Sequence, residues 1–91
     1  MSGPDDDRKL AVALEYERGS RAAPRVTAKG YGLIAETIVA LAEANDVVIE
    51  TNPALAQALA GVELEETIPV ELFEAVAEVI GFVLRARAGA R

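Results

Sequence analysis

Residues 24–36 read PRVTAKGYGLIAE, and this stretch decides the fold that the sequence predicts. Residues 25–28 form a short extended run, a turn follows at Lys29 and Gly30, and an apolar-periodic segment begins at Leu33. An extended run, a glycine turn and a helical period in this order indicate a strand, a turn and a helix. We therefore expect this turn to set where the first long helix leaves a sheet.

Two neighbouring segments predict further strands. Large side chains alternate with small or polar ones over residues 10–16, and this period of two favours a strand, although the alanines and leucines would also suit a helix. Together with residues 25–28 it predicts a β-hairpin with a long connection. Val-Val-Ile at residues 47–49 predicts a third strand, parallel to the second and reached through a right-handed crossover.

Three helices are also predicted. The first covers residues 31–44 and should end at Asn45, which tolerates a left-handed conformation. Its apolar stripe comprises Ile34, Ile38, Leu41 and Ala42. Asn52 and Pro53 start a short second helix, because an Asn side chain caps free N–H groups and proline suits the first turn. The last helix opens at residues 68–69. The predicted class is α/β (α+β), a small mixed sheet of about three strands with three helices packed on it.

Length and composition predict one small domain. The chain has 91 residues, 52% of them hydrophobic, which suffices for a modest core. We expect the domain to span residues 10–87, between a disordered tail at 1–9 and a frayed tail at 88–91. The start of the chain is too polar for a signal peptide, and no apolar run approaches the roughly 18 residues that span a bilayer. The expectation is a cytoplasmic protein that does not span the membrane.

Several kinds of chemistry are excluded by what the chain lacks. It contains no cysteine and no histidine, so thiol nucleophiles, serine–histidine catalysis and the commonest metal ligand are all missing. Gly30 and Gly32 lie between a strand and a helix, but neither a dinucleotide fingerprint nor a P-loop surrounds them. Glu63, Glu65 and Glu66 are expected to form a solvated acidic loop and not a metal site. The sequence therefore predicts no enzyme, no cofactor and no metal.

Charge is unevenly distributed along the chain. The net charge is −6, and residues 30–84 carry acidic residues throughout without a single Lys or Arg. Nucleic-acid binding requires clustered basic residues, so it is excluded. Two interpretations remain open: the acids coat the solvent-exposed faces of helices, or they form an acidic docking face for a basic partner.

The sequence resembles a known family. The segments that carry the resemblance are AVALEY at 11–16, APRVTAKG at 23–30, NPALAQAL at 52–59, EL at 63–64, IP at 68–69 and LFEAVAEVI at 72–80. In this order and spacing they resemble the cytoplasmic C-terminal domain of the FlhB/YscU export-switch proteins, which belong to flagellar and type III secretion apparatuses. The resemblance covers nearly the whole chain and implies the fold of that domain.

Two departures from the family pattern shape the expected function. Family members have an N-terminal membrane domain, and this sequence is expected to be a stand-alone form without it. The family's switch cleaves itself at an Asn-Pro-Thr-His motif just before the first strand, where this chain reads DDRKL at residues 6–10. The resemblance therefore implies that autocleavage does not occur here. Asn52 and Pro53 start a helix and are a different site.

The resemblance also implies a binding surface. In the family, a hydrophobic patch on this domain recognises early export substrates, and the matching positions are Ala23, Pro24, Ala77 and Ile80. From the residues alone, residues 22–24 are either ordinary loop or one wall of a shallow apolar patch whose other wall is the last helix. Plain core packing is the alternative for Ala77 and Ile80. We expect a partner to contact the loop before Arg25.

The implied function is therefore protein export without catalysis. The expected partners are the signal peptides of export substrates and proteins of the export apparatus, namely the gate and a truncated switch protein, with a location in the cytoplasm or at the membrane-bound apparatus. In this role the chain would replace the post-cleavage fragment. The alternative is a regulatory decoy, which would compete with the full-length switch protein without passing substrates on.

Overall fold

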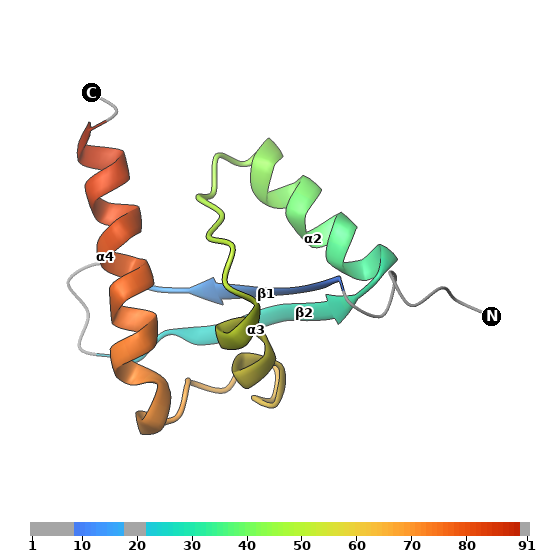
Figure 1. The fold of residues 1–91 in the computed structure, drawn as a ribbon, viewed down its shortest axis with the longest axis horizontal. Coiled ribbons are helices and arrows are strands. Elements are labelled where there is room, and N and C mark those ends of the chain that lie inside the picture. Colours follow the sequence, from blue (N-terminus) through green and yellow to red (C-terminus); the bar gives the residue numbers. More distant parts are fainter. Residues whose placement is uncertain (1–8, 18–21, 90–91) are drawn as a thin grey trace.

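The computed structural model describes residues 9–17 and 22–89, without the side chains of residues 82–89. The order of elements is β1 (Leu10–Glu15), β2 (Arg25–Tyr31), α2 (Leu33–Ala44), α3 (Pro53–Ala60), a 3-10 turn η1 (Val70–Leu72) and α4 (Phe73–Gly89). Helices α2 and α4 stand near opposite ends of the hairpin, and α3 packs against its strands between them (Figure 1). The predicted α/β class and its three helices are confirmed.

The two strands form an antiparallel ladder, as the hairpin prediction requires. Leu10 pairs with Tyr31 at one end and Glu15 with Arg25 at the other, with an irregularity between Ala13 and Leu14. Strand β2 runs further than predicted, because it continues through Lys29 and Gly30. The turn that was expected at those two residues lies beyond them.

Gly32 makes the turn from β2 into α2. Its backbone has φ 61° and ψ −125°, a conformation that residues with a Cβ rarely adopt. Its N–H donates to the carbonyl of Lys9 (2.9 Å) and its own carbonyl accepts from the N–H of Glu36 (3.0 Å). Gly32 is also buried. The glycine therefore positions α2 over the start of β1.

The predicted third strand is wrong. Among the described residues the sheet has two strands, and residues 47–49 run as irregular chain between α2 and α3. The N–H of Val47 donates to the carbonyl of Ala42 (2.8 Å), which ties the start of this segment to the end of α2. Val47 and Ile49 are 51% and 43% exposed. β-Branched composition favours a strand only where a neighbouring strand and a buried face are available, so the predicted parallel crossover is absent as well.

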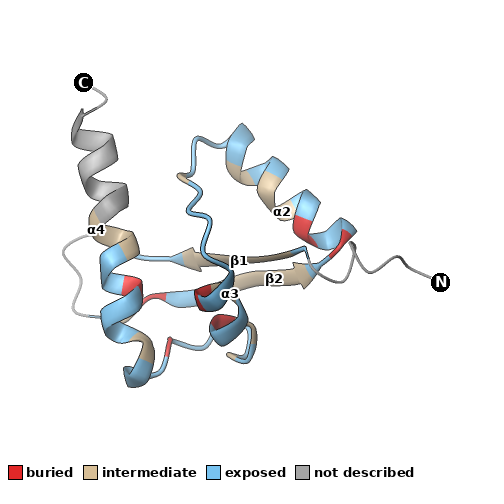
Figure 2. Ribbon diagram, viewed as in Figure 1, coloured by how far each residue is buried: buried red, intermediate tan, exposed pale blue. Residues whose placement is uncertain are grey.

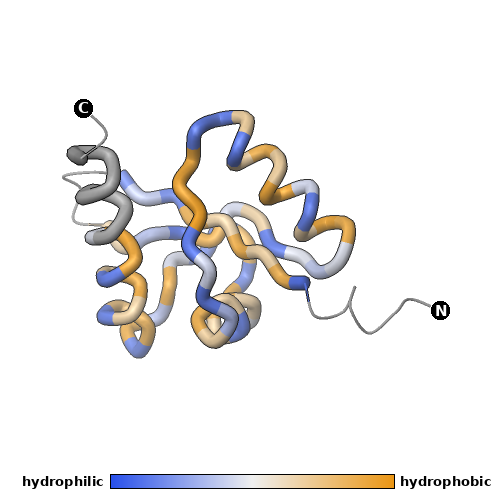
Figure 3. The backbone as a smooth tube through the Cα atoms, turned by 45° about the horizontal axis from the view of Figure 1, so that its top comes forward, coloured by the Kyte–Doolittle hydropathy of each residue, from blue (hydrophilic) through white to orange (hydrophobic). Residues whose placement is uncertain are grey.

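The predicted apolar stripe of α2 is right for Ile38 and Ala42 and wrong for Ile34 and Leu41, because the helix is rotated from the predicted orientation. Ala35 is buried and Ile38 and Ala42 are half-buried, whereas Ile34 and Leu41 are each 59% exposed. Apolar residues recur along α2 (Figure 3), so hydrophobicity alone defines the face poorly. The turn at Gly32 decides the rotation, and it places the small Ala35 against the strands.

The main core lies where α3 and α4 meet the hairpin. Its buried members are Leu55, Leu59, Ile68 and Val76. The half-buried residues packed around them are Val12, Leu14, Ala23, Leu72, Val79 and Ile80. Figure 2 shows buried positions on α3 and on α4, each beside exposed positions of the same helix. The loop before η1 contributes Ile68, so it belongs to the core as well.

Helix ends follow local rules with one correction. The Asn52 side chain accepts from the N–H of Leu55 (3.1 Å), and Pro53 occupies the first turn, as predicted. Asn45 does end α2, and its side-chain amide donates to the carbonyl of Leu41 (2.8 Å). Its φ is −110°, however, and the left-handed residue is Asp46, with φ 60°. Asn45 therefore caps α2 through its backbone N–H and its side-chain amide, and not through a left-handed backbone.

Candidate binding surface

The four predicted site residues differ in exposure. Pro24 is buried, Ala23 and Ile80 are half-buried, and Ala77 is exposed. Ala23 and Ile80 both pack against the same core cluster of Leu55, Leu59, Ile68 and Val76. Pro24 is buried, so a partner could not contact its ring without a rearrangement of the surrounding residues. The accessible part of the predicted patch is therefore Ala77 with the outer parts of Ala23 and Ile80.

Pro24 is held by an extended pairing that the sequence did not predict. Its carbonyl accepts from the N–H of Ile68 (3.0 Å), and Val26 exchanges hydrogen bonds with the acidic loop, donating to the carbonyl of Glu66 (3.1 Å) and accepting from the N–H of Glu65 (2.7 Å). Arg25 and Thr67 form an isolated bridge. Residues 65–68 thus run beside the start of β2 and fix the loop that precedes it.

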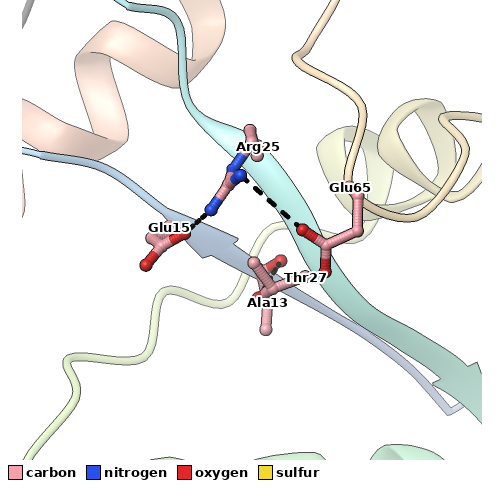
Figure 4. Close-up of polar contacts among 5 residues, drawn as sticks. All are labelled: Ala13, Glu15, Arg25, Thr27 and Glu65. Atoms are coloured by element: carbon pink, nitrogen blue, oxygen red, sulfur yellow. Dashed lines mark hydrogen bonds and ion pairs between the residues drawn. The ribbon is translucent and has the colours of Figure 1, made fainter.

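Arg25 links this pairing to the end of β1. Its guanidinium donates to the carboxylate of Glu15 and forms a longer ion pair with Glu65 (3.7 Å), while the hydroxyl of Thr27 donates to the carbonyl of Ala13 (3.4 Å) (Figure 4). The hydrogen bond to Glu15, and then the charge of that carboxylate, raises the pKa of Arg25 above its ordinary value. The group is therefore a permanently charged tie between both strands and the acidic loop.

Lys29 joins β2 to the end of α3. Its Nζ donates to the carbonyls of Ala60 (2.8 Å) and Val62 (2.6 Å). The first carbonyl belongs to the last residue of α3 and the second lies just past the helix end, where backbone acceptors lack helical partners and a positive charge is favourable. The sequence did not predict this contact. About thirty residues separate Lys29 from the carbonyls that it binds, and no local sequence pattern indicates such a distant pair.

A shallow groove runs between α4 and the segment before α3. Its volume is about 420 Å³. The residues that line it include Glu50, Asn52, Ala77, Glu78, Val79 and Gly81. Ala77 is the only predicted site residue on its wall. Two kinds of side chain dominate the lining of the groove. Small or apolar side chains lie along the helix, and Glu50 and Glu78 contribute carboxylates.

A second shallow groove lies between the start of β1 and α2. Its volume is about 380 Å³, and Leu10, Ala11, Ala35 and Val39 supply most of its apolar lining. The ion pair between Lys9 and Glu36 (2.5 Å) crosses its edge. No predicted site residue lines this groove.

Two structural findings bear on the classes of function. Within residues 9–17 and 22–89, no group of three or more acidic side chains is placed to hold a metal ion. Over the same residues, no helix combines the length and the apolar character needed to cross a bilayer.

Comparison with known sequences identifies relatives over most of the chain. The model of the FlhB HrpN YscU SpaS family matches residues 7–83. The flagellar biosynthetic protein FlhB of Aquifex aeolicus is 41% identical over 76 residues, which cover 82% of this chain and 22% of that protein. FlhB of Escherichia coli is 42% identical over 74 residues, covering 80% and 19%. This chain therefore spans about a fifth of the FlhB proteins that it matches. The uncharacterised protein YlqH of Bacillus subtilis is 35% identical over 77 residues, covering 85% of this chain and 83% of YlqH.

Solved structures with the same fold include domains of export proteins. The cytoplasmic domain of FlhB from Shewanella putrefaciens superimposes with a TM-score of 0.78 at 38% identity, covering 86% of this chain and 64% of that domain. The PscU C-terminal domain superimposes with a TM-score of 0.74 at 30% identity, covering 80% and 94%. Similarity in sequence and in fold thus extends over the hairpin, the core and most of α4.

Proposed function

The chain belongs to the FlhB HrpN YscU SpaS family, and from this premise we propose that it serves protein export as a binding module and not as an enzyme. The module binds export-substrate segments and docks on proteins of the export apparatus in the cytoplasm. The observation that carries the proposal is the match to the FlhB cytoplasmic domain over 86% of this chain at 38% identity.

The proposed contact surface is the accessible part of the predicted patch. Ala77 and Ile80 are three residues apart on α4, a spacing that places them side by side on one helix face. Ala23 packs against the same core as Ile80 and extends this face onto the loop. Pro24 supports the surface from behind, since it is buried and hydrogen-bonded to Ile68. The small side chains of Ala23 and Ala77 leave room for an apolar side chain of a bound peptide.

The experiment is complementation of an export strain whose FlhB is truncated before this domain. Expression of the chain should restore secretion of hook and filament proteins. Ala77→Asp places a charge on an exposed helical position and should lower that secretion at unchanged protein level. Ala40→Asp, also at an exposed mid-helix position but on α2, is the matched control and should secrete normally.

The alternative function, a decoy, gives a different outcome in the same strains. A decoy would fail to restore secretion although the protein is stably expressed, and it would lower secretion when overexpressed beside an intact FlhB. Equal secretion with Ala77→Asp and with the unmodified chain would refute the contact surface and leave the export role standing.

A further inference from the structure

We propose that the groove between residues 50–52 and α4 binds a cationic peptide segment with small apolar side chains, supplied by a separate protein. This inference rests on the proposed function and deepens it, because it specifies the chemistry of the bound segment. Ala77 belongs both to this groove and to the proposed contact surface, so a peptide on that surface continues into the groove.

The shape of the groove suits a peptide backbone. Its volume of about 420 Å³ lies within the roughly 300–1,000 Å³ that small ligand sites occupy. Ala75, Ala77 and Gly81 line the helical side, so bulky side chains do not block an approaching chain. Val79 adds a half-buried apolar contact. Small and medium apolar side chains are therefore accommodated, whereas large ones would stand out of the groove.

The charge of the groove selects a basic occupant. Glu50 and Glu78 are both exposed, and neither forms an ion pair with another residue in the described part of the chain. The three basic side chains that the structure describes are engaged elsewhere: Lys9 with Glu36, Arg25 with Glu15 and Glu65, and Lys29 with carbonyls at the end of α3. Among the described side chains, no basic group therefore pairs with either carboxylate, and the net charge of −6 favours the approach of a cationic partner to the protein as a whole.

Other occupants fit less well. Two carboxylates with alanine and glycine neighbours provide too few oxygen ligands for a hard cation, which takes six or more. An anion or a nucleic acid would be repelled. A second copy of the chain would present the same acidic middle, so like charges would oppose each other unless its basic C-terminal end entered the groove. A basic segment of another protein meets neither objection.

The test uses two synthetic probes and two double variants. The first probe is a fluorescein-labelled twelve-residue peptide that repeats Ala-Lys-Val-Ala, and in the second each Lys is replaced by Gln. The groove variant combines Glu50→Gln and Glu78→Gln. The control variant combines Glu63→Gln and Glu71→Gln, two exposed carboxylates away from the groove that change the net charge equally. Binding is followed by fluorescence anisotropy at several salt concentrations, and thermal unfolding confirms that both variants are folded.

The unmodified chain should bind the Lys probe about tenfold more tightly than the Gln probe at low salt, with the difference shrinking as salt screens the charges. Exposed ion pairs are individually weak, so the groove variant should lose about three- to tenfold in affinity for the Lys probe. The control variant should stay within about twofold, since its charges are remote from the groove.

Equal losses in both double variants would overturn the inference, because they would show attraction by the overall charge and not by the groove. Equal affinity for the two probes would overturn it as well. Salt-dependent self-association that the groove variant abolishes would identify a second copy as the occupant and would also refute it. The peptide-binding results do not depend on complementation by the unmodified chain. A refuted groove proposal can therefore be distinguished from a refuted export role.

Discussion

Replacing Gly32 by alanine tests the turn on which the fold depends. Gly32 has φ 61° and ψ −125°, is buried, and exchanges backbone hydrogen bonds with Lys9 and Glu36. A residue with a Cβ in such a sparsely populated region costs about 1–3 kcal/mol. The substitution also reduces the conformational freedom of the unfolded chain, which offsets about 0.4–1 kcal/mol. We expect a net loss of about 1–2 kcal/mol in the free energy of unfolding.

The expected loss is large enough to measure. In a domain of this size, each kcal/mol shifts the thermal midpoint by about 4–8 °C, so Gly32→Ala should lower it by about 4–16 °C. Urea unfolding followed by far-ultraviolet circular dichroism should show a lower midpoint with an unchanged slope, because the surface exposed on unfolding is the same.

Gly61→Ala is the matched control for this substitution. Gly61 has φ −79° and ψ −7°, and an added Cβ would meet only the carbonyl of Ala58 at 3.8 Å, an ordinary contact. Because its backbone suits alanine, we expect this variant to gain about 0.4–1 kcal/mol. A Gly32→Ala protein that is as stable as the unmodified chain would show that α2 does not require the positive φ, and our account of the turn would be refuted.

Substitutions at four further positions test individual contacts, with Ala77→Asp as a comparison for the last. Lys29→Met removes the charged donor of two carbonyls and should lower the free energy of unfolding by about 1.5–3 kcal/mol in urea titrations; no loss would mean that water replaces the cap. Asn52→Ala should cost about 1 kcal/mol, because the N–H of Leu55 loses its acceptor, and Asn52→Asp should retain most of that. Arg25→Gln should leave the thermal midpoint nearly unchanged, since its ion pairs are exposed to solvent and screened; a large shift would contradict that. Pro24→Asp buries a charge and should lower the midpoint sharply, whereas Ala77→Asp should not, and equal midpoints would show that Pro24 is accessible after all.

The features that the sequence predicted correctly all come from patterns among residues close together in the chain. The alternation over residues 10–16 predicted β1, and Asn52 with Pro53 marked the start of α3, since a cap joins residues only three positions apart. The family resemblance also came from local segments in a conserved order along the chain, and the family model and solved structures confirm it. The structure agrees with the predicted patch only in part: Ala23 and Ile80 pack against one core cluster, but Pro24 is buried.

The amino-acid sequence by itself determined the hairpin, the three helices, the absence of histidine and cysteine chemistry and the acidic middle of the chain. The tertiary structure alone decided that residues 47–49 are not a strand, that α2 buries Ala35 instead of Ile34, and that Lys29 caps α3. It also decided that Glu50, Ala77 and Glu78 line the same groove. The reason is the range of the contacts. Caps and periodicities join residues within one turn, whereas pairing, helix rotation and grooves depend on residues that are distant in the chain and become neighbours only on folding.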